Sequence, residues 1–407
     1  MNLTITNQTC EDIIFNGHYL EKLYFGNDLV WEKQHGHDYS QDYFTIESLE
    51  NGNTITLTRP YDPVYLSGIP YISNISWSKD KINWTTTVAD RSAQTAVITV
   101  NANAGEKVYW KSDGWYSRNM NDPTTYITFS STKTINVSGN ILSLVYEDNF
   151  AGVSGDKYKR FAGMFYENTK LINAINLILS TEISTSYSPF TGKICANVAD
   201  YANMFNGCTN LISAPELQDE IIRENTYYKM FMNCTSLVNA PTQINVTTFI
   251  PDSTFDNTFA KNCCESMFEG CTSLTSAPLL KTSTLSKYCY KNMFKGCTSL
   301  VNAPVLLSNN VFEGAYYGMF EGCTSLVNAP ELLSMSLATY CYYAMFRNCT
   351  SLKYIKCWAT SVSANYCTTN WVSGVGATGT FYKHPSMRSW STGNDGIPSG
   401  WTVINAS

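Results

Sequence analysis

The sequence predicts a multidomain protein in which all-β modules at the N-terminus precede a stacked array of helix-and-strand repeats and a C-terminal cap. Two observations carry this prediction. A Met-Phe motif followed by cysteine recurs six times, mostly at intervals of 26 residues, and short alternating apolar segments with turn residues between them fill the first 150 residues. A chain of 407 residues has room for about two to four domains. Because 44% of the residues are hydrophobic and 14% are aromatic, we expect an ordered core.

Charge and hydropathy exclude two classes of partner. Only 15% of the residues are charged, and 27 basic against 33 acidic residues give a net charge of −6. Without a basic excess there is little to neutralise phosphates, which argues against nucleic acid. No apolar run approaches the roughly 18 residues of a membrane-spanning helix, so no membrane span is expected. The first residues lack a basic segment followed by an apolar one, so we expect no secretory signal.

The repeats occupy residues 151–352 as roughly seven units. Within one unit, Cys289, Met293 and Cys297 are spaced four residues apart, which places three apolar side chains on one stripe of a helix. Gly296 suits a helix end, and the segment from Leu300 to Pro304 has the length of one strand. We therefore predict a helix, a tight turn and a short strand in each unit. The predicted repeat core consists of Met204, Met230, Met267, Met293, Met319 and Met345 with Cys208, Cys234, Cys271, Cys297, Cys323 and Cys349.

The unit sequence, MF-x-G/N-C-T-S-L-x-x-A-P, resembles the BspA-like leucine-rich repeat, in which Ala-Phe or Met-Phe similarly precedes Gly-Cys-Thr/Ser-Ser-Leu. The resemblance covers roughly Phe161 to Cys357 and recurs in six nearly unchanged copies. It implies a right-handed leucine-rich-repeat solenoid whose strands form one continuous sheet. Repeats of this kind occur in phage virion proteins, including those of crAss-like gut phages, and in bacterial surface adhesins.

The cysteines leave three interpretations open. The chain has no CxxC motif, and its four histidines lie outside the repeats, which argues against a metal site. A disulfide can form between neighbouring units, but not within one helix, where positions eight residues apart are separated by about 12 Å along the axis. We favour reduced, buried cysteines that pack as small hydrophobic side chains. No metal and no cofactor are expected.

Residues 1–33 are predicted to form a small β docking module, followed by a polar linker at 34–41. Asn16-Gly17 and Gly26-Asn27-Asp28 each separate two apolar segments, which is typical of β-hairpins. The stretch resembles the N-terminal segment of many phage tail and fibre proteins, and this resemblance implies docking on a virion or a partner protein. An ordinary β-hairpin domain is the alternative. The candidate docking residues are Phe15, Tyr24, Phe25 and Trp31.

Residues 42–150 are predicted to form a β-sandwich-like domain, because seven short alternating segments are separated by turn signals. The predicted strands are 43–49, 54–58, 72–77, 96–100, 107–110, 126–129 and 134–137, and residues 78–84 are predicted to form a hairpin turn. After Leu352 the repeat breaks. Residues 353–407, with four tryptophans, are the predicted C-terminal cap, which a repeat array needs over its last apolar unit.

The sequence contains no coherent catalytic constellation. It has no nucleophile elbow, P-loop, HExxH or GxGxxG motif, and no histidine within the repeats accompanies their cysteines. We therefore predict that the protein is not an enzyme.

Tyrosines favour a binding function, because they give rigid amphipathic contact area at low entropic cost. Those on the predicted helices are Tyr227, Tyr228, Tyr288, Tyr290, Tyr316, Tyr317, Tyr340, Tyr342 and Tyr343. The candidate contact surface consists of Tyr228, Tyr290, Tyr317 and Tyr343, and packing between units is the alternative for each. Asn239, Asn302 and Asn328 recur as a ladder or as glycan contacts. Insertions around 181–194 and 246–258 are candidate binding loops.

These features together predict a structural or binding protein of a phage virion, associated with the tail or fibre. It docks by its N-terminus and presents its repeats for host-surface attachment or assembly. The expected partners are other virion proteins and a host surface glycan or protein, and a homo-oligomer is left open. The expected location is the virion, assembled in the host cytoplasm. A bacterial cell-surface adhesin is the alternative, and a carbohydrate-active enzyme is a distant one.

Overall fold

The structure is a computed structural model. It describes strands within residues 13–32 and then residues 42–60, 74–88, 95–115, 121–150, 161–179, 200–249, 261–387 and 390–406, apart from positions 218, 220, 245 and 247. The predicted linker at 34–41, the insertion at 181–194 and most of the insertion at 246–258 lie outside these residues. The chain divides into two compact units, Met1–Asp42 and Tyr43–Ser407. The finer domain boundaries remain predictions.

The first unit contains two antiparallel strand pairs. Strand β1 (Ile13–Phe15) pairs with β2 (His18–Leu20), and β3 (Lys22–Phe25) pairs with β4 (Asp28–Glu32). Both antiparallel pairs lie where the sequence predicts hairpins, because Asn-Gly and Gly-Asn-Asp are typical turn sequences between paired strands.

The second unit begins with two sheets that share one hydrophobic core. The larger sheet has the order β13-β12-β5-β10-β7-β8, and the smaller has the order β11-β6-β9. All seven predicted strands are present, with β8 in addition. Their bounds are β5 Phe44–Ser48, β6 Asn53–Arg59, β7 Asn74–Ser78, β8 Thr85–Val88, β9 Ala96–Ala102, β10 Lys107–Ser112, β11 Thr128–Ser131 and β12 Ile135–Asn140. Residues 78–84 connect β7 to its antiparallel partner β8, as predicted.

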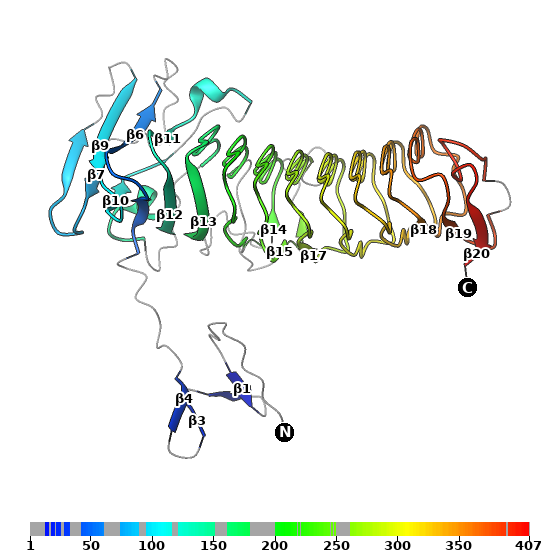
Figure 1. Ribbon diagram of the computed structural model, residues 1–407, viewed down its shortest axis with the longest axis horizontal. Coiled ribbons are helices and arrows are strands. Elements are labelled where there is room, and N and C mark those ends of the chain that lie inside the picture. Colours follow the sequence, from blue (N-terminus) through cyan, green and yellow to red (C-terminus); the bar gives the residue numbers. More distant parts are fainter. Residues whose placement is uncertain are drawn as a thin grey trace. The chain divides into compact units, whose positions relative to one another are not determined.

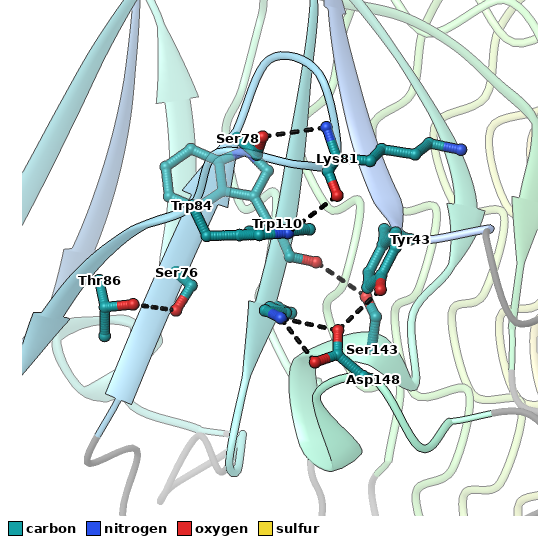
Figure 2. Close-up of polar contacts among 10 residues, drawn as sticks. Tyr43, Ser76, Ser78, Lys81, Trp84, Thr86, Trp110, Ser143 and Asp148 are labelled. Atoms are coloured by element: carbon teal, nitrogen blue, oxygen red, sulfur yellow. Dashed lines mark hydrogen bonds and ion pairs between the residues drawn. The ribbon is translucent and has the colours of Figure 1, made fainter.

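Strand β12 joins these sheets to the repeats. It pairs antiparallel with β5 on one side and parallel with β13 (Leu171–Ile178), the first strand of the repeat region, on the other. The short helix α1 (Ser143–Tyr146) follows β12. Beyond α1, Asp148 accepts a hydrogen bond of 2.7 Å from the Tyr43 hydroxyl (Figure 2). It also accepts one of 2.7 Å from the Lys111 ammonium. These bonds fasten the segment after α1 to β10.

The repeat region does not have the predicted architecture. Within the described residues the one α-helix, α1, precedes the repeats, and each predicted helix is instead a run of turns. The strands between β13 and the cap are two residues long and form two-stranded sheets: β14 (Ile221–Ile222) with β16 (Thr248–Phe249), and β15 (Gln243–Ile244) with β17 (Leu279–Leu280). The prediction of a helix-and-strand, leucine-rich-repeat solenoid with one continuous sheet is therefore wrong.

Backbone conformation explains why turns replace helices. Tyr288, Asn292 and Gly296, spaced four residues apart, have φ values of 55°, 56° and 74°, which no α-helix accommodates. Backbone amides of the turns donate to two kinds of acceptor. Some donate within their own unit, as the Met293 amide does to the Tyr290 carbonyl at 3.2 Å, and others donate to the next unit, as the Tyr290 amide does to the Ala315 carbonyl at 3.0 Å. The units stack as similar coils along the chain (Figure 1). We call this arrangement the turn stack.

Aromatic columns fill the turn stack. Neighbouring phenylalanine rings lie 5.3 to 5.8 Å apart with planes within 9° of parallel. The column consists of Phe165, Phe205, Phe231, Phe268, Phe294, Phe320 and Phe346. Tyr290, Tyr316 and Tyr342 form a parallel buried column with centroids 6.2 and 6.1 Å apart. Identical rings at a fixed period thus give continuous burial that a single unit cannot achieve.

The C-terminal residues close the stack. Strands β18 (Tyr354–Cys357), β19 (Thr380–Lys383) and β20 (Thr402–Asn405) form a parallel three-stranded sheet. Trp371 is fully buried and stacks on Trp390 with centroids 5.6 Å apart and on Tyr342 at 6.2 Å. Within the described ranges, no helix is long and apolar enough to cross a bilayer.

Candidate binding surface

The predicted repeat-core residues form a buried ladder. The six methionines and six cysteines are all 0% exposed. Each cysteine thiol donates to the phenylalanine carbonyl of the preceding unit, with S···O distances from 2.9 to 3.1 Å. All twelve described cysteines are free and buried. Burial raises the pKa of thiols such as Cys297, which keeps them protonated and poor nucleophiles.

The four predicted contact tyrosines do not share one environment. Tyr290 is 2% exposed and belongs to the buried tyrosine column. Tyr228, Tyr317 and Tyr343 lie one position later in their units and are half-buried. In the unit of Tyr290 that outer position is Lys291. The prediction for Tyr290 was wrong because a shift of one residue in a turn exchanges an inward for an outward position.

A contiguous tyrosine surface lies on the turns at the C-terminal half of the stack. Tyr317 and Tyr343 stack with centroids 4.5 Å apart, and Tyr340 stacks on Tyr366 at 5.1 Å. Tyr340 also meets the edge of the Tyr343 ring at 5.9 Å, which joins the two pairs. Together with Tyr288, these residues define the tyrosine ridge. Tyr366 is 59% exposed.

Tyr288, Tyr340 and Tyr366 occupy the same position in three turns of the stack, and the backbone at this position is left-handed. Their φ values are 55°, 57° and 55°, a region that costs a bulky residue about 1 to 2 kcal/mol. Gly314 occupies the same position between Tyr288 and Tyr340. A Cβ atom there would lie 2.1 Å from the Cε1 atom of Tyr288, so the Tyr288 ring fills the space that this glycine leaves open.

Paired charges hold the N-terminal end of the ridge. The Tyr288 hydroxyl donates to Glu313 at 2.7 Å, and Lys287 pairs with the same carboxylate at 3.2 Å. The Lys291 ammonium lies 5.7 Å from the Tyr288 ring centroid and 5.8 Å from that of Tyr317. Desolvation, aided by the Glu313 carboxylate, raises the pKa of Tyr288 to about 12, so its hydroxyl stays neutral near pH 7.

Sequence reasoning missed Tyr366, because it lies in the segment where the repeat motif has broken. A signal was present. Tyr366 directly precedes Cys367, as Tyr340 precedes Cys341 and Tyr288 precedes Cys289. The four candidate docking residues belong to the compact unit Met1–Asp42 and fall on strands β1, β3 and β4. Their side chains lie outside the described part of the chain.

The strand side of the stack carries the predicted asparagine ladder. Asn302 bridges to Ser276 and Asn328 in parallel backbone pairs, and Asn239 donates to the Ser213 hydroxyl at 2.9 Å. Asn239, Asn302 and Asn328 are exposed.

The ridge offers aromatic edges, hydroxyl groups and paired charges, which are the means of noncovalent recognition. Among the described residues, no group of three or more His, Cys, Asp and Glu side chains could hold a metal ion. No protein-family model, curated protein or solved structure matches this chain.

Proposed function

We propose that the protein is a structural and binding protein whose tyrosine ridge makes noncovalent contact with a protein or glycan partner. The observation that carries this proposal is the continuous set of ring contacts on the turn surface, in which Tyr317 stacks on Tyr343 and Tyr340 contacts both Tyr343 and Tyr366. Stacking against a neighbouring ring fixes these side chains before a partner arrives. Tyrosine side chains fixed in this way lose little entropy on binding.

The setting that we propose is a phage virion, with the protein attached through its N-terminal unit. The support is the likeness of the first 33 residues to phage tail and fibre segments, together with the repeat motif. A bacterial surface adhesin would use the same ridge on a different particle. Mass spectrometry of purified phage particles and of host membrane fractions separates the two. Recovery in membrane fractions alone would reject the virion.

The ridge is tested with a double variant, Tyr343→Ala with Tyr366→Ala. The control is Tyr354→Ala with Tyr382→Ala, which removes two half-buried tyrosines, with ring centroids 5.2 Å apart, from the sheet of the cap. Binding of the fluorescently labelled full chain to host cells is measured by titration. We expect at least a tenfold weaker affinity for the ridge variant and little change for the control. Equal binding by all three folded proteins would reject the ridge as the contact surface.

A further inference from the structure

A shallow hollow of about 280 Å³ lies on the β-sandwich-like domain, at the start of strand β10. Its lining consists of Lys79, Gly105, Glu106, Lys107 and Tyr109. The hollow is distinct from the tyrosine ridge, which is built from the turns of the repeat region.

The hollow has a positive charge on a protein of net charge −6. Lys79 and Lys107 are both exposed, and the Lys81 ammonium lies 4.9 Å from the centroid of the Tyr109 ring. Glu106 is the one acidic residue of the lining. Asp80, the neighbouring carboxylate, accepts hydrogen bonds from the backbone amides of its own turn, at 2.7 Å from Asn83, so it is committed to holding the loop.

The two carboxylate oxygens of Glu106 differ in their hydrogen bonding. Its Oε2 atom accepts from the Lys79 ammonium at 2.9 Å and from the Asn103 amide at 2.7 Å. Both bonds also lower the pKa of Glu106, so the carboxylate stays ionised. Among the described residues no donor reaches the Oε1 atom, which can therefore accept a hydrogen bond from a ligand hydroxyl.

The loop that carries Lys79 and Lys81 is fixed before any ligand arrives, and Lys107 is the first residue of strand β10. Figure 2 shows the Ser78 hydroxyl accepting from the Lys81 amide at 3.0 Å and the Trp84 indole donating to the Lys81 carbonyl at 3.1 Å. Lys81 has a φ of 63°, a left-handed conformation that this network stabilises. A site organised in advance loses less entropy when it binds.

We propose that this hollow binds an acidic sugar residue, with its carboxylate between the Lys79 and Lys107 ammonium groups and a hydroxyl donated to Glu106 Oε1. Two cationic donors beside one anionic acceptor match a ligand that carries a carboxylate and hydroxyl groups on one small ring. An acidic peptide would use the two lysines but would leave the Glu106 oxygen opposite further negative charge. This site goes beyond the proposed function, since the ridge plays no part in it.

The experiment titrates the full chain with D-glucuronic acid, D-glucose, inorganic phosphate and a tetraglutamate peptide, followed by ligand-observed NMR. The test variant is Lys79→Gln with Lys107→Gln. The control, Lys133→Gln with Lys281→Gln, removes the same charge from two other exposed positions. Both pairs are exposed, so we expect all three proteins to share one thermal midpoint within experimental error.

We expect saturable binding of glucuronic acid, at least tenfold weaker binding of glucose, and at least a tenfold loss of affinity for glucuronic acid in the test variant alone. Binding should also weaken between 50 and 500 mM salt, because the ammonium groups are exposed. Equal affinities for glucose and glucuronic acid would overturn the proposal. So would an unchanged affinity in the test variant, or binding of phosphate or tetraglutamate as tight as that of the acidic sugar. A ridge variant should leave this binding intact, so the two sites fail independently.

Discussion

The Tyr288 ring lies over Gly314, and this packing gives a sharp test of the turn stack. Replacing Gly314 with alanine places a Cβ atom 2.1 Å from Cε1 and 2.2 Å from Cδ1 of the ring, so the ring must move. Gly322 is the matched control. It also has a left-handed backbone, but a Cβ atom there would come no closer than 3.7 Å to Gly296.

The structure gives the expected magnitudes. Both substitutions place alanine at positive φ, which costs about 1 to 2 kcal/mol, and restriction of the unfolded chain offsets about 0.4 to 1 kcal/mol of that cost. Gly322→Ala should therefore destabilise by about 1 kcal/mol. Gly314→Ala also disrupts the Tyr288 hydroxyl bond to Glu313, worth about 1 kcal/mol, and displaces the ring. We expect a total of about 2 to 3 kcal/mol.

Urea unfolding of the purified variants, followed by circular dichroism, measures these differences. A double-mutant cycle with Tyr288→Ala isolates the contact, because alanine at position 288 has no ring to displace. In the Tyr288→Ala protein, Gly314→Ala should lower the free energy of unfolding by no more than Gly322→Ala does in the wild-type chain. The coupling energy between positions 288 and 314 should therefore be about 1 to 2 kcal/mol. If Gly314→Ala and Gly322→Ala are equally destabilising in the wild-type chain, the ring does not occupy this space and the reasoning is refuted.

Three further predictions follow from the packing and the charges. Phe294→Ala removes the ring that stacks on its two neighbours at centroid distances of 5.6 and 5.7 Å. It should lower the free energy of unfolding by about 3 to 5 kcal/mol, and a urea midpoint close to that of the wild type would contradict the phenylalanine column. In thiol titration the native protein should react slowly, and denaturation without reductant should release close to all 14 cysteines; release of fewer than the twelve described thiols would show disulfides. Desolvation acts to raise the pKa of Asp148, but hydrogen bonds from Lys111 and Tyr43 outweigh it and lower that pKa below the ordinary value of an aspartate. The stability that Asp148 contributes is thus present above about pH 4 and lost as the pH falls through its folded pKa. The thermal midpoints of wild type and Asp148→Asn should therefore differ by a constant amount above about pH 4 and converge as the pH falls further, and a difference that persists at the lowest pH would contradict the assignment.

The β-rich first part of the chain could be predicted because its signals are local. Alternating apolar residues and turn residues specify where a strand begins and ends, whatever the partner strand is. Strand β8 was missed because Thr85, Thr86 and Thr87 show no apolar alternation. Its position depends on antiparallel pairing with β7, including a 2.8 Å contact between the Ser76 and Thr86 hydroxyls.

The predicted helices failed because a spacing of four residues fits two structures. An α-helix repeats every 3.6 residues, and a series of four-residue turns repeats every four, so both bury the same methionines and cysteines. The glycines of one unit held the distinguishing signal. Gly314, Gly318 and Gly322 recur every four residues and have φ values of 59°, 57° and 75°, which a helix would not use.

The sequence by itself determined that the second half of the chain is periodic and that its repeated methionines and cysteines are apolar core positions. Only the tertiary structure decided the local conformation of each unit. The physical reason is that many amides in a turn bond to the next unit, as the Phe294 amide does to the Met319 carbonyl at 2.9 Å. Tyr290 points into the core and Tyr317 joins the ridge because they occupy adjacent positions of their units, and only the turn conformation decides which of these positions faces inward.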